Sequence, residues 1–196
     1  MRRITCLAIL TMAGLAGCVM SYSLVAPGLV TVQDLKLQAD GNWNRAPANY
    51  VPLSRRDAET WTRDGLLLDR LVIVPGVPDG EPVLYSREPT AALPVFRADM
   101  LPNEIEELVE SSLVKVFGEG QSVVNTANLR PQRFGEHPGV MFDFEATVTD
   151  SPEYRGTAGA FVANDRLYLV YFIGAVPHYY DKHLASATAI IQSALL

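Results

Sequence analysis

The stretch YRGTAGAFVANDRLYLVYFIG, residues 154–174, decides the fold of this chain. Two runs of apolar and small residues flank Asn164-Asp165, a dipeptide typical of a two-residue turn between antiparallel strands. Such a turn fixes the register of the strands, so we expect Ala158 to lie opposite Tyr171. The sequence therefore predicts an antiparallel hairpin near the carboxyl end.

More strands are predicted ahead of this hairpin, near 121–134 and 139–149. The short connections between consecutive strands imply an antiparallel sheet. Small side chains allow a helix to approach the sheet closely, and the relevant residues are Gly156, Ala158 and Ala160.

Two helices are predicted beside these strands. The first runs from about Glu104 to Phe117, with Asn103 and Glu106 as a candidate capping box and Gly118 as its stop. The second runs from about Asp181, its expected cap, to Leu195. We expect the second helix to cover the small residues of the sheet through Leu184, Ala185, Ala187, Ala189 and Ile191.

The amino-terminal half is predicted to add further strands. Residues 29–38 alternate in polarity and are interpreted as one strand. Arg63-Asp64-Gly65 lies between apolar runs at 59–62 and 66–74, which predicts a hairpin. Six of the thirteen prolines fall within 75–102, so only short edge strands are expected there, at Val83-Leu84-Tyr85 and Val95-Phe96.

The order of strands, helix, strands and helix predicts an α+β domain, an antiparallel β-sheet with an amphipathic helix and a C-terminal helix packed on it. Residues 103–195 resemble the PsbP-like fold, most of all in the aromatic strand Leu167 to Gly174 followed by Tyr179 and Tyr180. That fold also occurs in small bacterial envelope lipoproteins. The resemblance implies a non-catalytic binding or assembly module.

The amino terminus resembles the signal of a bacterial lipoprotein. Arg2 and Arg3 precede an apolar run that ends in Leu15-Ala16-Gly17-Cys18, which is similar to a lipobox. The resemblance implies cleavage between Gly17 and Cys18 and acylation of Cys18, which would attach the protein to the lipid bilayer. An ordinary signal peptide with an accidental cysteine and a retained amino-terminal anchor are the alternatives.

These segments predict three parts: a signal peptide at 1–17, a lipidated tether at 18–28 and a single α+β domain at 29–196. The expected location is the bacterial cell envelope, with the lipid-anchored domain facing the periplasm. Val19 follows the cysteine at a position where Asp often marks retention in the inner membrane of enteric bacteria. The outer membrane is therefore favoured.

Charge and cysteine content narrow the possible functions. Cleavage removes two of the 16 basic residues and none of the 22 acidic ones, so the net charge changes from −6 to −8. This balance argues against nucleic acid as a partner. Cys6 would leave with the signal and Cys18 would be acylated, so no thiol remains for catalysis.

The catalytic motifs that we considered have structural explanations. Ser112 and Lys115 spell S-x-x-K, but the S-D-N and K-T-G partners of that motif are absent from the chain. Asp143 and Glu145 alternate with phenylalanines on a strand and are typical of a solvated face. No nucleotide-binding motif occurs, so we expect no cofactor and assign no catalytic residue.

His178, Asp181 and His183 are the best metal-ligand candidates in the sequence, because imidazole and carboxylate suit zinc. The simpler interpretation keeps Asp181 as a helix cap, and His137 could join such a site only through long-range folding.

The favoured function is a non-catalytic module that binds an envelope protein or a small molecule. The candidate binding residues are Trp61, Tyr179, Tyr180 and His178. The alternative is a membrane-tethered hydrolase or metal-dependent enzyme that uses His178, Asp181 and His183. Metal analysis of the purified protein would discriminate between the two.

Overall fold

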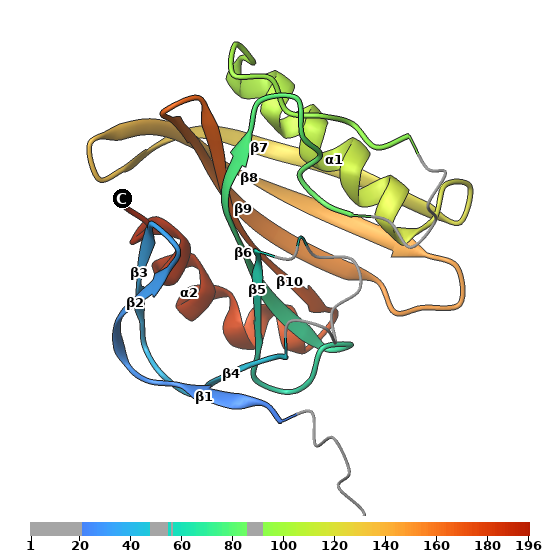
Figure 1. Ribbon diagram of the computed structural model, residues 1–196. Helices are drawn as coiled ribbons and strands as arrows, with labels where there is room; N and C mark the ends of the chain where they lie inside the picture. Colours follow the sequence, from blue (N-terminus) through green and yellow to red (C-terminus); the bar gives the residue numbers. More distant parts are fainter. Residues whose placement is uncertain (1–20, 48–54, 56, 86–91) are drawn as a thin grey trace, which may run out of the picture.

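The computed structural model describes residues 21–47, 55, 57–85 and 92–196 (Figure 1). Its strands are β1 (Ser23–Val25), β2 (Gly28–Val32), β3 (Leu35–Ala39), β4 (Trp43–Arg45), β5 (Glu59–Thr62), β6 (Asp69–Pro78), β7 (Ser122–Phe134), β8 (His137–Val148), β9 (Tyr154–Ala163) and β10 (Arg166–Ala175). Its helices are α1 (Pro102–Phe117) and α2 (Tyr179–Gln192). The predicted α+β class, with an antiparallel sheet and two helices, is confirmed.

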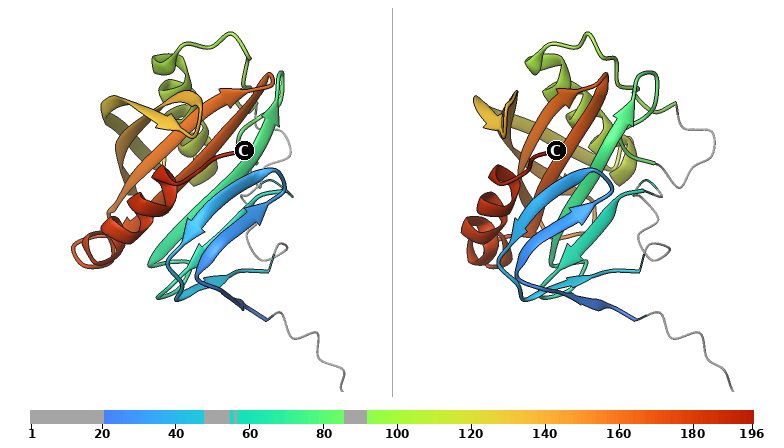
Figure 2. Two further views of the ribbon diagram at one scale, coloured as in Figure 1. Left: turned by 90° about the vertical axis from the view of Figure 1, so that its left-hand side faces the viewer. Right: turned by 60° about the vertical axis from the view of Figure 1, so that its left-hand side comes forward.

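Eight of the strands form one twisted antiparallel sheet in the order β1-β4-β5-β6-β10-β9-β8-β7, and β2 and β3 form a separate hairpin (Figure 2). The predicted turn at Asn164-Asp165 joins β9 to β10, and both of its residues have positive φ, at 52° and 56°. Ala158 pairs with Tyr171 in the predicted register. The predicted hairpin at 63–65 is also confirmed, since β5 and β6 pair through Trp61 and Leu71.

The sheet separates two apolar cores. One core includes Leu108 and Val109 of α1 with Phe142 and Phe144 of β8. The other lies on the side of α2 and includes Trp43, Trp61, Phe172 and Ile191. Because side chains alternate along a strand, each central strand contributes to both cores.

The packing face predicted for the last helix is wrong. Ala158 and Ala160 point into the core shared with α1, whereas α2 lies on the opposite face. There it approaches Gly159, where a Cβ would lie 2.5 Å from Ile191 Cγ2, and Gly174, where a Cβ would lie 2.7 Å from the Cα of Tyr180. The buried residues of α2 are Tyr180, His183, Ala187, Ile190 and Ile191, whereas Ala185 and Ala189 are exposed.

The helix caps also differ from the prediction. α1 begins at Pro102, and Glu104 accepts a 2.7 Å hydrogen bond from the Leu101 N–H, so Asn103 and Glu106 do not form the capping box. Proline suits the first helical position because its missing N–H would be unpaired there. The cap position of α2 is His178, three residues before the first carboxylate of the helix at Asp181, so Asp181 is not the cap.

The single strand predicted at 29–38 is two strands. The chain reverses at Gln33, which has a φ of 55°, and β2 pairs with β3. Asp34 at this turn accepts a 2.6 Å hydrogen bond from the Tyr168 hydroxyl. Burial and the hydrogen bond to Asp34 raise the pKa of Tyr168 to about 12, so the phenol keeps the proton that it donates.

The tether predicted at 18–28 overlaps β1, which pairs with β4, so the folded part of the chain begins before residue 29. Gly17 and Cys18 lie outside the described residues. Within the described residues, no helix has the length and apolar character needed to cross a membrane.

The proline-rich segment contributes more to the fold than expected. β6 extends to Pro78, and Pro75-Gly76 forms a bulge opposite Tyr168, where a missing amide donor is tolerated. The edge strands predicted at Val83-Leu84-Tyr85 and Val95-Phe96 amount to one isolated bridge between Pro82 and Val95.

Candidate functional site

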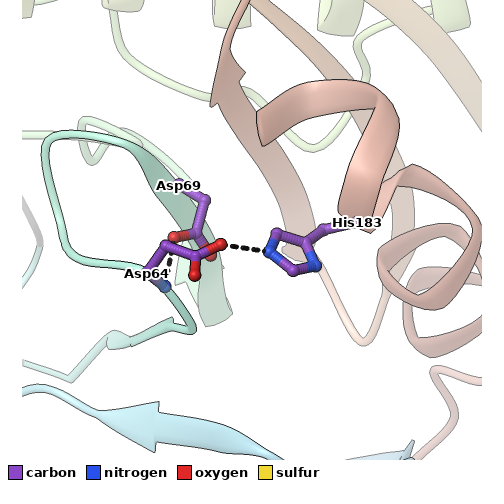
Figure 3. A group of neighbouring side chains, drawn as sticks. All are labelled: Asp64, Asp69 and His183. Atoms are coloured by element: carbon purple, nitrogen blue, oxygen red, sulfur yellow. Dashed lines mark hydrogen bonds and ion pairs between the residues drawn. The ribbon is translucent and has the colours of Figure 1, made fainter. Parts of the chain in front are cut away.

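A cluster of polar side chains joins the β5–β6 loop to α2. Asp64, Asp69 and His183 each offer one ligand-type atom within 4.8 Å of the others (Figure 3). Asp64 belongs to the loop 63–68, Asp69 begins β6, and His183 lies on the buried face of α2. The fold therefore brings these two carboxylates next to an imidazole that lies more than a hundred residues later in the chain.

Asp69 organises the loop. Its Oδ1 accepts hydrogen bonds from the Thr62 hydroxyl at 3.1 Å and from the Asp64 N–H at 2.8 Å, and its Oδ2 accepts one from the Arg63 N–H at 2.8 Å. The Asp69 residue is 1% exposed. A buried carboxylate with these three donors holds the loop backbone in one conformation.

Asp64 connects the loop to α2. Its Oδ2 lies 2.6 Å from Nε2 of His183 and 2.7 Å from Nζ of Lys182. Hydrogen bonds from Lys182 and then from His183 lower the pKa of the Asp64 carboxyl despite its partial burial. An ionised carboxylate can only accept, so Nε2 of His183 carries the proton in this pair.

Arg63 makes a second connection to α2. Its Nη2 donates at 2.8 Å to both carboxylate oxygens of Asp40 and at 2.9 Å to the Ser186 hydroxyl, while its guanidinium lies 4.5 Å from the ring centre of Trp43. Burial tends to raise the pKa of Asp40, but hydrogen bonds from Ser186 and Arg63 outweigh it and lower that pKa. We call the set Asp40, Arg63, Asp64, Lys182, His183 and Ser186 the α2 clasp.

The atoms of this cluster that could bind a metal ion already form hydrogen bonds and ion pairs within the protein. The Asp69 oxygens accept three hydrogen bonds, and the oxygen of Asp64 nearest His183 also contacts the Lys182 ammonium. A cation would have to displace this ammonium and the His183 proton. The chemistry of the donor set therefore suits an internal ion-pair network better than a metal centre.

The three metal-ligand candidates named from the sequence do not lie together in one group. Within the part of the chain that the structure describes, the group with metal-like spacing contains His183 but neither His178 nor Asp181. His178 contacts the ring of Tyr179, and Asp181 is exposed. Sequence reasoning missed Asp64 and Asp69, because the Asp-Gly pair indicated only a turn and nothing local related it to α2.

Two of the four candidate binding residues lie in the core. Trp61 is 0% exposed and donates through Nε1 to Glu59 at 2.8 Å. Tyr180 is buried and stacks on Phe172. His178 is exposed and Tyr179 is partly exposed, so these two remain accessible to a partner.

The remaining motif candidates make contacts within the protein. The Ser112 hydroxyl is buried and donates to the Leu108 carbonyl at 2.6 Å, while Lys115 pairs with Glu119. Asp143 and Glu145 form ion pairs with Arg130 and Arg155. His137 stacks on Phe161, with 5.7 Å between the ring centres.

No protein-family model and no curated protein matches the chain. Among solved structures, the chain is similar to cyanobacterial PsbP (CyanoP) from Synechocystis sp. PCC 6803. The TM-score is 0.55 at 10% sequence identity, and the alignment covers 95% of this chain and 98% of the other. The fold is PsbP-like. The similarity includes the proline-rich part and the amino-terminal strands, whereas the sequence indicated a PsbP-like pattern only for residues 103–195.

Proposed function

We propose that this protein is a lipid-anchored protein of the bacterial cell envelope and that its PsbP-like domain is a non-catalytic binding or assembly module. The observation that carries the proposal is the position of Leu15-Ala16-Gly17-Cys18, only five residues before the first strand of a PsbP-like fold. A lipobox at this distance would hold the domain at a membrane surface, facing the periplasm. We favour the outer membrane because Val19 follows the cysteine.

The internal pairing of the polar side chains supports a binding role over a catalytic one. Asp64, Lys182 and His183 satisfy one another, so the α2 clasp fixes the position of α2. A catalytic acid or base must instead reach a substrate within hydrogen-bonding distance. The partner in this proposal is an envelope protein or a small molecule, and the accessible His178 and Tyr179 remain candidates for contacting it.

The anchor is tested by replacing its cysteine. We expect Cys18→Ala to abolish incorporation of labelled fatty acid and to block cleavage of the signal peptide, because in lipoproteins acylation of this cysteine precedes cleavage. Cys6→Ala is the matched control, since Cys6 lies within the signal peptide and its replacement should leave labelling unchanged. Unchanged labelling and unchanged cleavage of Cys18→Ala would refute the anchor.

A further inference from the structure

The β5–β6 loop presents an apolar side chain to solvent. The loop contains three consecutive leucines, and the middle one, Leu67, is 78% exposed. Leu24 of β1 is 72% exposed. Among the described residues, these are the two large apolar side chains with the highest exposure.

The backbone of the loop that carries Leu67 is fixed by hydrogen bonds. The Gly65 N–H donates to the Thr62 hydroxyl at 2.9 Å, the Tyr154 hydroxyl donates to the Leu67 carbonyl at 3.0 Å, and the Ala175 N–H donates to the Leu68 carbonyl at 2.8 Å. Asp69 and the α2 clasp hold the first residues of the loop. Because backbone on both sides of Leu67 is fixed, its side chain is held outward.

Leu24 and the β5–β6 loop lie at the same end of the molecule. Leu24 pairs with Asn44 and Asn44 pairs with Thr62, the residue that leads into the loop. Two strand spacings separate Leu24 from Thr62, which amounts to about 10 Å. Figures 1 and 2 show β1 and this loop at the end of the domain where the chain enters from the amino terminus.

The length of the chain before β1 identifies what this end faces. On the proposed function, Cys18 carries acyl chains within a bilayer, and four residues separate it from Ser23. The five steps from Cys18 to Ser23 span at most about 18 Å when the chain is extended, so β1 and its neighbours must lie close to the membrane surface. The acidic chain offers little attraction to anionic headgroups, so any contact there relies on apolar side chains.

We propose that Leu24 and Leu67 form a membrane-contact patch that inserts into the lipid surface beside the anchor. This inference rests on the proposed function. The patch orients the domain, with the β5–β6 loop toward the lipid and the far end of β6 toward the periplasm. In this proposal, the α2 clasp and Asp69 hold the loop in the conformation that presents Leu67 to the lipid.

The test uses two variants of the lipidated, full-length protein. One carries a fluorescent label in the proposed patch, and the other carries the same label at the opposite end of the domain. Leu67→Cys and the control Leu101→Cys are labelled with an NBD dye and reconstituted into phosphatidylethanolamine and phosphatidylglycerol vesicles that contain doxyl-labelled lipid. Leu101 is a matched leucine, 61% exposed, and follows Ala98, whose N–H donates to Asp79 just beyond the carboxyl end of β6. Circular dichroism checks that both variants fold.

We expect doxyl lipid to quench the Leu67 label at least about threefold more strongly than the Leu101 label. Equal quenching in vesicle-bound protein would overturn the patch and leave the anchor standing. A Leu67 label shielded from aqueous iodide but not quenched by doxyl lipid would mean that a second copy of this protein covers the patch, which also overturns the inference. Protein that is not acylated and does not float with the vesicles would overturn the proposed function, and the patch with it.

Discussion

At the scale of single residues, the stability of this protein depends on pairs that are distant in sequence. Asp64 receives hydrogen bonds from Lys182 and His183, which lie on a helix more than a hundred residues later. Charge-assisted hydrogen bonds are stronger than neutral ones. When one partner is removed, the remaining charged group loses this bond and must be hydrated instead. Asp64, like Arg63, is therefore a residue through which the loop and α2 stabilise each other.

We expect Asp64→Asn to lower the free energy of unfolding by about 1–2 kcal/mol at pH 7. The native pKa of Asp64 is lowered, first by the hydrogen bond from Lys182, so the stabilisation is present above the unfolded pKa, near 3.9. It is lost as the pH falls through the lowered native value. The difference between wild type and variant should therefore shrink below about pH 4, measured by urea unfolding at each pH.

Asp181→Asn is the control for this prediction, because Asp181 is exposed in the first turn of the same helix. Its loss should cost only a few tenths of a kcal/mol, through the helix dipole. A difference between wild type and Asp64→Asn that persists unchanged at acid pH would show that charge pairing is not its cause.

Residue-level features were predictable where the signal is local. Asn164-Asp165 specified a turn and a register, because a two-residue hairpin leaves few alternatives. Trp61 and Tyr180 could not be assigned to the core or the surface from local sequence, since aromatic residues suit both. The link between Asp64 and His183 requires the fold itself, so the sequence led instead to the neighbours His178 and Asp181.

At the scale of elements, α2 is positioned by glycines that a larger side chain would obstruct. A Cβ at Gly159 would lie 2.5 Å from Ile191 Cγ2 and 2.9 Å from Cζ of Phe134. The sequence correctly suggested that small residues in this strand allow a helix to approach. It identified the wrong ones, because strand periodicity alone does not say which face receives which helix.

We expect Gly159→Ala to destabilise the protein by about 1–3 kcal/mol, because the added methyl group must displace α2 or Phe134. The matching experiment adds Ile191→Ala, which removes the atom nearest to the new methyl group. Thermal unfolding of the two single variants and the double variant should show a double-variant loss smaller than the sum of the single losses. Additive losses would mean that Gly159 is not in contact with α2 through Ile191.

The strand prediction for 29–38 failed for a related reason. Burial follows Val32, Leu35, Leu37 and Ala39, so the buried face changes parity at the turn, and Leu29 is 63% exposed. A reversal at Gln33-Asp34 produces this change without a glycine or proline to mark it. The hydrogen bond from Tyr168 to Asp34, across 134 residues, helps to hold the turn and has no local signature.

At the scale of the whole molecule, the folded unit begins earlier than the sequence indicated. The sequence predicts a tether at 18–28 because the first clear alternation of polarity begins at residue 29. Yet Val25 is 3% exposed in the core beneath α2, and β1 covers the edge of β4. Residues 23–25 are therefore part of the folded domain, which shortens the distance between the proposed anchor and that domain.

We expect a chain that begins at residue 29 to be less stable than one that begins at residue 21 by about 1.5–3 kcal/mol, because it exposes the site of Val25 and leaves the outer edge of β4 unpaired. Urea unfolding of the two chains measures the difference. Val25→Ala in the longer chain should reproduce part of the loss, whereas Leu24→Ala, one residue away but exposed, should stay within about 0.5 kcal/mol of wild type. Equal stability of the two chains would show that residues 21–28 do not stabilise the domain and behave as a tether.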